Sequence, residues 1–213
     1  MPNYHPEIMQ GTDEWYAIRL GKLTASDFHV MLGKSQTKVD KLYEIIFERI
    51  TNNTDKEQVS TFAMERGKIL ESEARRLYSA VYEVPVEETG FVEPDEDNPY
   101  YGYIGSSPDG LIGEEGGLEI KSPLGKNFLQ WTHTIEDGSL TVDYIKPEYR
   151  TQIEFNLMVT GRKWWDFCLY HPLLGLAVRR VISDPDIRRN IEKSLAECVE
   201  FIKNKTGENN DTI

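Results

Sequence analysis

Apolar side chains recur every three or four residues in the first and last parts of the chain, which is the spacing of one face of a helix. The middle part instead contains short runs in which apolar and polar residues alternate, as they do along a strand. Turn-forming residues separate these segments. We therefore expect helices over residues 12–20, 24–32, 38–50, 61–81, 127–133, 148–160 and 184–202, and strands over residues 84–92, 100–104, 118–121, 164–170 and 177–182.

The order of these segments indicates the fold class. Helices come first, then strands with helices between them, then a closing helix, and this order is typical of an α/β protein with a central mixed β-sheet flanked by helices. A chain of 213 residues, 39% of them hydrophobic, can bury the core of one domain. We expect residues 1–205 to form that single domain and the polar residues 206–213 to form a disordered tail.

The stretch from Gly105 to Pro123 carries the clearest chemistry. Glu119 and Lys121 alternate with apolar neighbours, so on a strand both side chains point to the same face. A hairpin that turns near residues 113–117 would bring Asp109 back beside Glu119. Two carboxylates and an ammonium group would then converge in one place.

Carboxylates this close repel each other unless a cation lies between them, and oxygen ligands favour hard cations such as Mg²⁺ or Mn²⁺. Such an ion can activate water for attack on a phosphate. Lys121 could then orient or deprotonate the water, or neutralise the developing charge. The alternative is a surface hairpin in which Glu119 and Lys121 form an ordinary, weakly stabilising ion pair.

The helix over residues 61–81 could supply a further carboxylate, but the pattern does not identify one. Glu71 and Glu73 flank the apolar stripe of this helix on opposite sides, so either could reach inward as a ligand. Glu71 could instead pair with Arg75, one turn later. The apolar stripe itself consists of Leu70, Ala74, Leu77 and Val81.

Residues near the N-terminus allow two interpretations. Thr24 and Asp27 have the spacing of a capping box, in which Thr24 caps a helix and Asp27 reciprocates. Alternatively the Ser26 hydroxyl, the free amides of the first helical turn and Arg19 form a phosphate site. The local pattern alone favours the capping interpretation.

The formal net charge of −12 argues against a nucleic-acid partner only if it is spread over the whole surface. It is concentrated instead, because residues 83–119 contain eleven acidic residues and no Lys or Arg. The remainder of the chain has 25 acidic and 24 basic residues and is nearly neutral. An acidic hairpin can attract divalent cations while basic surfaces elsewhere bind phosphates. The composition therefore permits a nucleic-acid enzyme.

Several classes of protein are not indicated. No apolar stretch approaches the ~18 residues of a membrane span, and no signal peptide is visible, so we expect a soluble cytoplasmic protein. Cys168 and Cys198 lack metal-ligand spacing and are expected to be buried thiols. The four histidines have no zinc-like spacing, and we interpret them as surface or packing residues.

The central residues resemble a known signature. Asp109, preceded by Pro108, and Glu119-Ile120-Lys121 match the PD-(D/E)xK nucleases. Most of the chain is similar, more specifically, to the lambda-type phage exonucleases and their YqaJ-like viral recombinase relatives. The similar motifs, in order, are Glu14-Trp15, Arg19-Leu20-Gly21-Lys22-Leu23-Thr24-Ala25-Ser26, Gly67-Lys68-Ile69-Leu70-Glu71, Ser107-Pro108-Asp109-Gly110-Leu111, Gly117-Leu118-Glu119-Ile120-Lys121-Ser122-Pro123, Tyr149-Arg150-Thr151-Gln152 and Val159-Thr160-Gly161-Arg162.

The resemblance implies a restriction-endonuclease-like core and a catalytic role for four side chains. Asp109 and Glu119 would bind Mg²⁺, for which Mn²⁺ could substitute, with the Ile120 carbonyl as a further ligand. Glu71 would be the helix carboxylate for a second metal, and Lys121 would act on the attacking water. The residues that would hold the 5′-terminal phosphate are Arg19, Ser26, Ser107 and Gln152.

The resemblance also implies an activity. Such an enzyme is a Mg²⁺-dependent 5′→3′ exonuclease that digests the 5′-ended strand of linear double-stranded DNA and leaves 3′ single-stranded overhangs. Members of the family form homotrimeric rings around DNA and supply an annealing protein with single strands for recombination. The alternatives are a PD-(D/E)xK endonuclease of restriction or repair type and a non-catalytic DNA-end-binding subunit. Residues 33–63 match less clearly, so no duplex-gripping residue is assigned there.

Overall fold

A computed structural model describes residues 1–55 and 62–208 of the chain. Its strands are β1 (Asn3–His5), β2 (Leu23–Thr24), β3 (Phe91–Glu93), β4 (Ile104–Gly105), β5 (Gly110–Ile112), β6 (Gly116–Lys121), β7 (Thr132–Thr134), β8 (Leu140–Val142), β9 (Trp164–His171) and β10 (Gly175–Ile182). Its helices are α1 (Asp13–Arg19), the 3₁₀ helix η1 (Phe28–Leu32), α2 (Gln36–Thr51), α3 (Phe62–Tyr82), α4 (Gly125–Gln130), α5 (Pro147–Thr160) and α6 (Pro185–Thr206).

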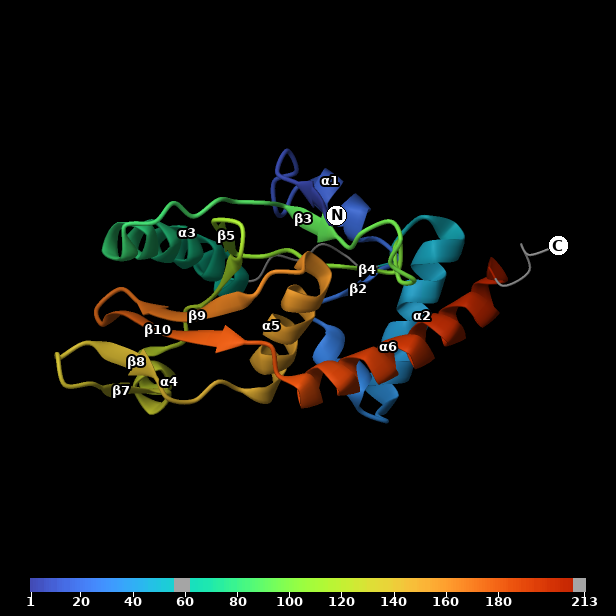
Figure 1. Ribbon diagram of the computed structural model, residues 1–213. Helices are drawn as coiled ribbons and strands as arrows, with labels where there is room; N and C mark the ends of the chain where they lie inside the picture. Colours follow the sequence, from blue (N-terminus) through green and yellow to red (C-terminus); the bar gives the residue numbers. More distant parts are fainter. Residues whose placement is uncertain (56–61, 209–213) are drawn as a thin grey trace.

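Six of these strands form a central mixed sheet in the order β5-β6-β9-β10-β8-β7 (Figure 1). Strands β6 and β9 are parallel, as are β8 and β10, and the other neighbours are antiparallel. Pairs β1–β3 and β2–β4 form two small additional sheets. The expectation of an α/β fold with a mixed sheet is confirmed.

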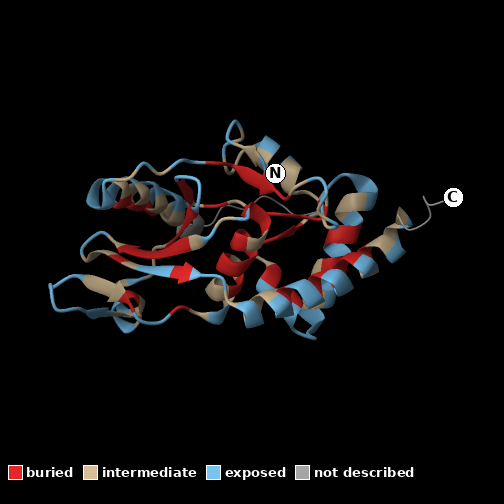
Figure 2. Ribbon diagram, viewed as in Figure 1, coloured by how far each residue is buried: buried red, intermediate tan, exposed pale blue. Residues whose placement is uncertain are grey.

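Helices lie on both faces of the central sheet, and Figure 2 shows its central strand β9 as mostly buried. Helix α3 packs on one face, where Leu70 and Ala74 meet Ile120 of β6. Helices α4 and α5 pack on the other face, where Phe128 and Ile153 lie in one cluster with residues of β9. Helices α2 and α6 and η1 join α5 in a further core cluster beyond the sheet (Figure 1). Side chains at the centre of β6 are therefore enclosed between α3 and α5.

Helix α5 begins and ends where the sequence predicts. Pro147 occupies its first turn, where the missing N–H costs nothing, and Gly161 follows its last residue at φ +67°. Helix α6 is capped by Asp184, whose side chain accepts hydrogen bonds from the N–H groups of Asp186 and Ile187. Both helices start where expected and α5 also ends there, whereas α6 continues to Thr206, beyond the expected end at residue 202.

The predicted capping box is wrong. Thr24 lies in β2, paired with Gly105 of β4, so its backbone is part of a strand and not of a helix cap. The following helix is a 3₁₀ helix that starts only at Phe28, and the Asp27 side chain makes no capping hydrogen bond. Asp27 instead forms an ion pair with Lys41 at 2.8 Å. Ser26 therefore lies in the turn before the helix.

The apolar stripe expected on α3 is correct at Leu70 and Ala74 only. Leu77 and Val81 are exposed, and Tyr78 is buried in their place. The reason is a tertiary contact, because the Tyr78 hydroxyl donates a 2.6 Å hydrogen bond to the buried Asp166 carboxylate of β9. This contact sets the rotation of α3 against the sheet.

Several strand predictions were too long. Of residues 84–92 only the last two belong to β3, apart from a single bridge between Glu87 and Leu111. Of residues 100–104 only Ile104 is in a strand, since the preceding residues form turns. The helix expected over 127–133 stops at Gln130, because the next residues pair with β8 as β7.

The C-terminal residues are described as far as Glu208. Helix α6 ends at Thr206, and Glu208 accepts hydrogen bonds from Arg49 at 2.9 Å. The rest of the expected tail, residues 209–213, lies outside the described residues, as do residues 56–58 of the expected loop after α2. Cys168 and Cys198 are free and buried. Within residues 1–55 and 62–208 no helix is long and apolar enough to cross a membrane.

Candidate active site

The hairpin of β5 and β6 places Asp109 against the middle of β6. Gly110 is paired with Leu118, so Asp109, one residue earlier, lies opposite Glu119. The Oδ2 atom of Asp109 accepts a 2.6 Å hydrogen bond from the backbone N–H of Ile120. The expected convergence of Asp109 and Glu119 is confirmed.

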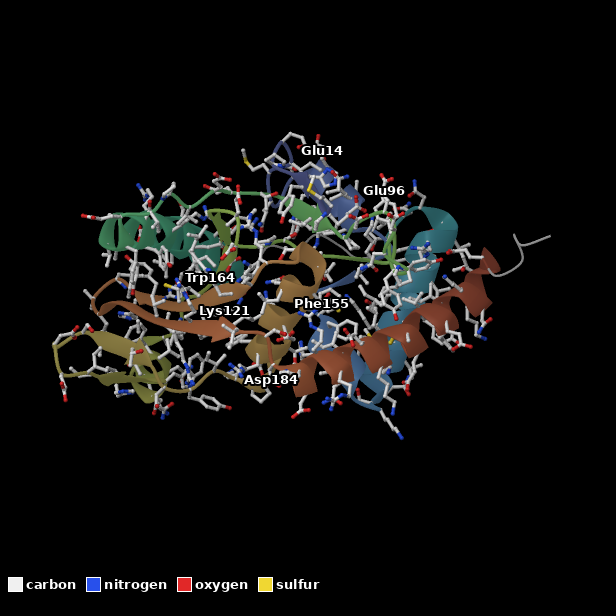
Figure 3. All side chains as sticks on the ribbon, viewed as in Figure 1. Glu14, Glu96, Lys121, Phe155, Trp164 and Asp184 are labelled. Atoms are coloured by element: carbon white, nitrogen blue, oxygen red, sulfur yellow. The ribbon has the colours of Figure 1, made fainter. Side chains whose placement is uncertain are left out.

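Glu119 is fully buried, with 0% of its surface exposed. Its Oε1 atom accepts a 2.6 Å hydrogen bond from Lys121 Nζ, and its Oε2 atom accepts a 3.4 Å hydrogen bond from Asn156 Nδ2 of α5. The ammonium group of Lys121 also lies 5.3 Å from the centre of the Tyr149 ring. Lys121 thus sits near the middle of the molecule, between the sheet and α5 (Figure 3).

Glu71 supplies the carboxylate from α3. It accepts a 2.7 Å hydrogen bond from Arg75 Nη2, so the pairing considered from the sequence is present. The same guanidinium donates a 2.7 Å hydrogen bond from Nε to the backbone carbonyl of Asp109, which ties α3 to β5. Glu73 contacts the Tyr170 hydroxyl at 3.2 Å, on the face of β9 covered by α3. The structure therefore brings Glu71, and not Glu73, to the hairpin.

Burial and mutual repulsion change the acidity of these carboxyl groups. Burial, together with the charges of Asp109 and Glu119, raises the pKa of Glu71 to about 8. Burial and the charge of Asp109 raise the pKa of Glu119 to about 7, and burial also raises the pKa of Asp109. Burial lowers the pKa of Lys121, but the negative charges of Glu119 and Asp109 have the larger effect and raise this pKa above its usual value. The site therefore favours bound positive charge.

A second cluster lies two residues before Asp109, around Ser107. Its Oγ atom accepts hydrogen bonds of 2.9 Å from Arg19 Nη1 and 2.9 Å from Trp15 Nε1. Because a hydroxyl has one hydrogen to donate, Ser107 can still donate to a further acceptor. Arg19 Nη2 donates to Thr24 Oγ1 at 3.3 Å, and Ser26 Oγ lies 3.4 Å from that oxygen.

The Arg19 guanidinium is held on three sides. It stacks over the Trp15 ring at 4.2 Å from the ring centre, in addition to its bonds to Ser107 and Thr24. Burial lowers the Arg19 pKa, but an arginine stays charged at any ordinary pH. A fixed planar cation beside two hydroxyl groups can bind a phosphate through paired hydrogen bonds.

Gln152 is the one predicted phosphate ligand that this hydrogen-bond network does not reach within the described residues. It lies on α5 one turn before Asn156 and three residues after Tyr149, and these two neighbours contact Glu119 and Lys121. Gln152 therefore lies on the face of α5 that packs against β6.

Several residues of the site were not identified from the sequence. For Arg75 the one-turn spacing from Glu71 was noticed, but its bond to the Asp109 carbonyl depends on the fold. Asn156 could have been found because it lies one turn after Gln152. Trp15 is half-buried, and its contact with Ser107 through the ring N–H also depends on the fold.

The donor atoms fit a small hard cation. Within residues 1–55 and 62–208 no three His, Cys, Asp or Glu side chains lie close enough to hold a metal by themselves. Mg²⁺, however, is commonly bound through one or two carboxylates and several waters. Asp109 and Glu119 provide these, and the buried Asn156 Oδ1 beside them has no hydrogen-bond partner in the described part of the chain. A hydrated ion would complement this set of oxygens.

Several solved structures with a similar fold are exonucleases. The alkaline exonuclease LHK-Exo from Laribacter hongkongensis is 30% identical, with a TM-score of 0.70 over 95% of this chain and 100% of that one. Its complex with dAMP gives 32% identity and a TM-score of 0.71 over 92% and 99% of the chains. A phage-related exonuclease from Haemophilus somnus is 12% identical, with a TM-score of 0.56 over 88% and 96%, and shares the fold. No curated protein matches the chain.

The fold is restriction-endonuclease-like, as the resemblance implied. The family model of the YqaJ-like viral recombinase domain matches residues 14–163. This range begins one residue before Trp15 and contains every residue of the two clusters described above. The family model, the fold and the similar solved structures all indicate the same family. The chain belongs to the YqaJ-like viral recombinase family, related to the lambda-type exonucleases.

Proposed function

We propose that the protein is a Mg²⁺-dependent exonuclease that digests the 5′-ended strand of linear double-stranded DNA and leaves 3′ single-stranded overhangs. The observation that carries this proposal is the spacing of the two clusters. The Arg19–Ser107 cluster, which suits a phosphate, lies two residues from Asp109, which suits a metal ion. A terminal phosphate held at the first cluster would place the next phosphodiester bond at the second.

The metal would be held by Asp109, Glu119 and the Ile120 carbonyl, with Glu71 available for a second ion. Both backbone groups of one strand residue point to the same edge, so the Ile120 carbonyl emerges on the side where its N–H meets Asp109. When bound, Mg²⁺ supplies an activated water and stabilises the charge on the reacting phosphate.

Lys121 would position the reacting groups. Its ammonium group is held by Glu119 at 2.6 Å and by the nearby Tyr149 ring. An ammonium fixed in this way can orient the attacking water and offset the negative charge that develops on the phosphate oxygens. Asn156 holds the other oxygen of Glu119, so both partners keep Glu119 from turning away.

Arg19, Ser107 and Ser26 would bind the 5′-terminal phosphate, with Gln152 contributing from α5. This anchor would set the polarity of digestion. A strand that enters by its 5′ end places its first phosphodiester bond at the metal, whereas a strand that enters by its 3′ end does not. Overhangs produced in this manner suit an annealing protein. The family's homotrimeric ring around DNA is part of the same proposal.

Digestion of an end-labelled linear duplex tests the proposal. We expect release of 5′ mononucleotides that requires Mg²⁺ or Mn²⁺, stops with EDTA and is faster on ends with a 5′-phosphate. A closed circular duplex of the same sequence is the control and should stay intact. Efficient cutting of the circle would instead support an endonuclease. Tight binding of ends without Mg²⁺-dependent release of nucleotides would support a non-catalytic end-binding subunit.

A further inference from the structure

A row of cations and aromatic rings leads away from the candidate active site. Tyr149 has Lys121 Nζ 5.3 Å and Lys146 Nζ 5.6 Å from its ring centre. The Lys146 ammonium also lies 5.0 Å from the centre of the Trp131 ring. The two ammonium groups are thus no further apart than one or two nucleotides of an extended strand.

Buried residues of the core hold the aromatic rings of this row in place. The Tyr149 ring stacks on Phe167 of β9 with centres 5.6 Å apart, and Phe167 is the strand neighbour of Glu119. Trp131 meets Tyr149 edge-on at 6.5 Å, and its backbone carbonyl accepts a 2.8 Å hydrogen bond from the N–H of Asp143. Trp131 and Lys146 remain partly exposed, and 35% of the Lys146 side chain is accessible.

This row lies on the opposite side of the metal-binding carboxylates from the Arg19 cluster. The sheet order places Asp109, just before β5, at one edge, then Glu119 on β6, then Phe167 on β9 beneath Tyr149. Arg19 lies at the end of α1 and contacts Ser107, two residues before Asp109, while Trp131 follows α4. Figure 1 shows α1 and α4 on opposite sides of β9.

A DNA strand anchored by its 5′-phosphate at Arg19 and cleaved at Asp109 and Glu119 must continue past Lys121. We infer that Lys146 and Trp131 form a binding site for the degraded strand on the 3′ side of the scissile bond. Lys146 contacts the second internucleotide phosphate from the 5′ end, and Trp131 stacks on a base next to it. This inference rests on the proposed exonuclease function and adds a subsite to it.

The chemistry of the row fits a nucleic-acid strand. Single strands bind where cations follow the backbone and aromatic rings accept the bases. Lys146 has an acidic partner, Glu148, at 3.3 Å, but 40% of that side chain is exposed. Exposed pairs of this kind are weak, so a phosphate can displace Glu148.

A double-mutant cycle between protein and DNA tests the phosphate contact. The substrate is a linear 5′-phosphorylated duplex whose second internucleotide phosphate is natural or replaced by an uncharged methylphosphonate, and the readout is kcat/KM for release of the first nucleotide. We expect the methylphosphonate to lower this value about fivefold with the unmutated enzyme and less than about twofold with Lys146→Met. Lys193→Met, which changes an exposed lysine of α6, should behave like the unmutated enzyme.

The stacking contact is tested separately. Trp131→Ala should lower kcat/KM on the natural duplex by roughly fivefold or more, while Trp131→Phe, which keeps a ring, should stay within about twofold of the unmutated enzyme. Equal methylphosphonate effects in Lys146→Met and the unmutated enzyme would overturn the inference, as would full activity of Trp131→Ala. Failure of the unmutated protein to digest the natural duplex would instead overturn the proposed function itself.

Discussion

Two carboxylates of the candidate active site, those of Glu119 and Glu71, each form a short ion pair with a basic side chain. Lys121 lies 2.6 Å from Glu119, and Arg75 lies 2.7 Å from Glu71. An exposed ion pair contributes about 1 kcal/mol or less, whereas a buried carboxylate left without a partner costs several kcal/mol. These two cations therefore allow carboxylates to be gathered inside the protein before any metal binds.

Replacing Lys121 by Ala should abolish turnover while leaving binding of DNA ends intact. Loss of a fixed group that stabilises the reacting phosphate costs roughly 100-fold or more in kcat. The variant should still fold, because Glu119, whose pKa is already about 7, can take up a proton when its partner is removed. Single-turnover digestion and end binding measured in Ca²⁺ give the two readouts. A kcat within tenfold of the unmutated enzyme would contradict the assigned role.

Replacing Arg19 by Ala should remove the preference for 5′-phosphorylated ends. A charge-assisted hydrogen bond contributes about 1.5–3 kcal/mol, so the ratio of kcat/KM between phosphorylated and unphosphorylated ends should fall roughly 10- to 100-fold. The matched control is Arg189→Ala. Arg189 is an exposed residue of α6, and its guanidinium pairs with Asp186 on the surface. If the unmutated enzyme digests both kinds of end at equal rates, the phosphate site is wrongly assigned.

At the scale of secondary-structure elements, the β5–β6 hairpin is clamped from outside by Arg162. This residue follows the end of α5, and its Nη1 atom donates hydrogen bonds to the carbonyls of Gly113 at 2.7 Å and Gly116 at 2.5 Å. Gly113 lies in the turn between β5 and β6, and Gly116 is the first residue of β6, so both carbonyls flank the tip of the hairpin. The residue just beyond the end of α5 thus fixes the tip of the hairpin, while Asn156 and Tyr149 on the face of α5 contact Glu119 and Lys121 of the candidate active site.

Arg162→Ala should loosen the hairpin. Loss of hydrogen bonds from a charged donor to backbone carbonyls is expected to lower the free energy of unfolding by roughly 2–3 kcal/mol. For a chain of this size that corresponds to a melting temperature lower by roughly 4–12 °C. Lys163→Ala is the control, since its side chain pairs with Glu115 on the surface of the same turn. Equal melting temperatures of the two variants would show that the clamp has little effect.

At the scale of the whole molecule, the β5–β6 hairpin that carries the candidate active site is enclosed between α3 and α5. Glu71 arrives from one face of the sheet and Asn156 from the other, so the site forms only when all three layers are assembled. The metal ion proposed for this site would link the layers. Any ligand that binds the folded state alone stabilises it by mass action.

Mg²⁺ should therefore raise the melting temperature of the protein in the absence of DNA. At about 100 times the dissociation constant, the stabilisation is ~2.7 kcal/mol, which is equivalent to roughly 5–10 °C. NaCl at matched ionic strength controls for screening. Asp109→Asn should lose most of this shift, since an amide is a weaker ligand for a hard cation, while it can still accept the Ile120 N–H bond. An undiminished shift in Asp109→Asn would place the ion elsewhere.

Sequence patterns were most reliable where local interactions decide the structure. Helix α5 starts at Pro147 and stops before Gly161, and α6 starts after Asp184, because prolines, left-handed glycines and capping side chains act within one turn. Sequence patterns were least reliable where a contact between residues distant in the sequence decides which side chains are buried. Tyr78 replaced Leu77 on the buried face of α3 because of Asp166, 88 residues later.

By itself the sequence determined that Asp109, Glu119 and Lys121 share one place, because a hairpin with a period of two leaves little freedom. It also placed Arg19 and Ser107 among the candidate phosphate ligands through resemblance to a family. The helical pattern left Glu71 and Glu73 open and the family resemblance favoured Glu71, but only the folded structure shows Glu71 beside the hairpin and joins Ser107 to Trp15. The physical reason is that helix rotation and long-range hydrogen bonds depend on packing against the sheet, which no local pattern encodes.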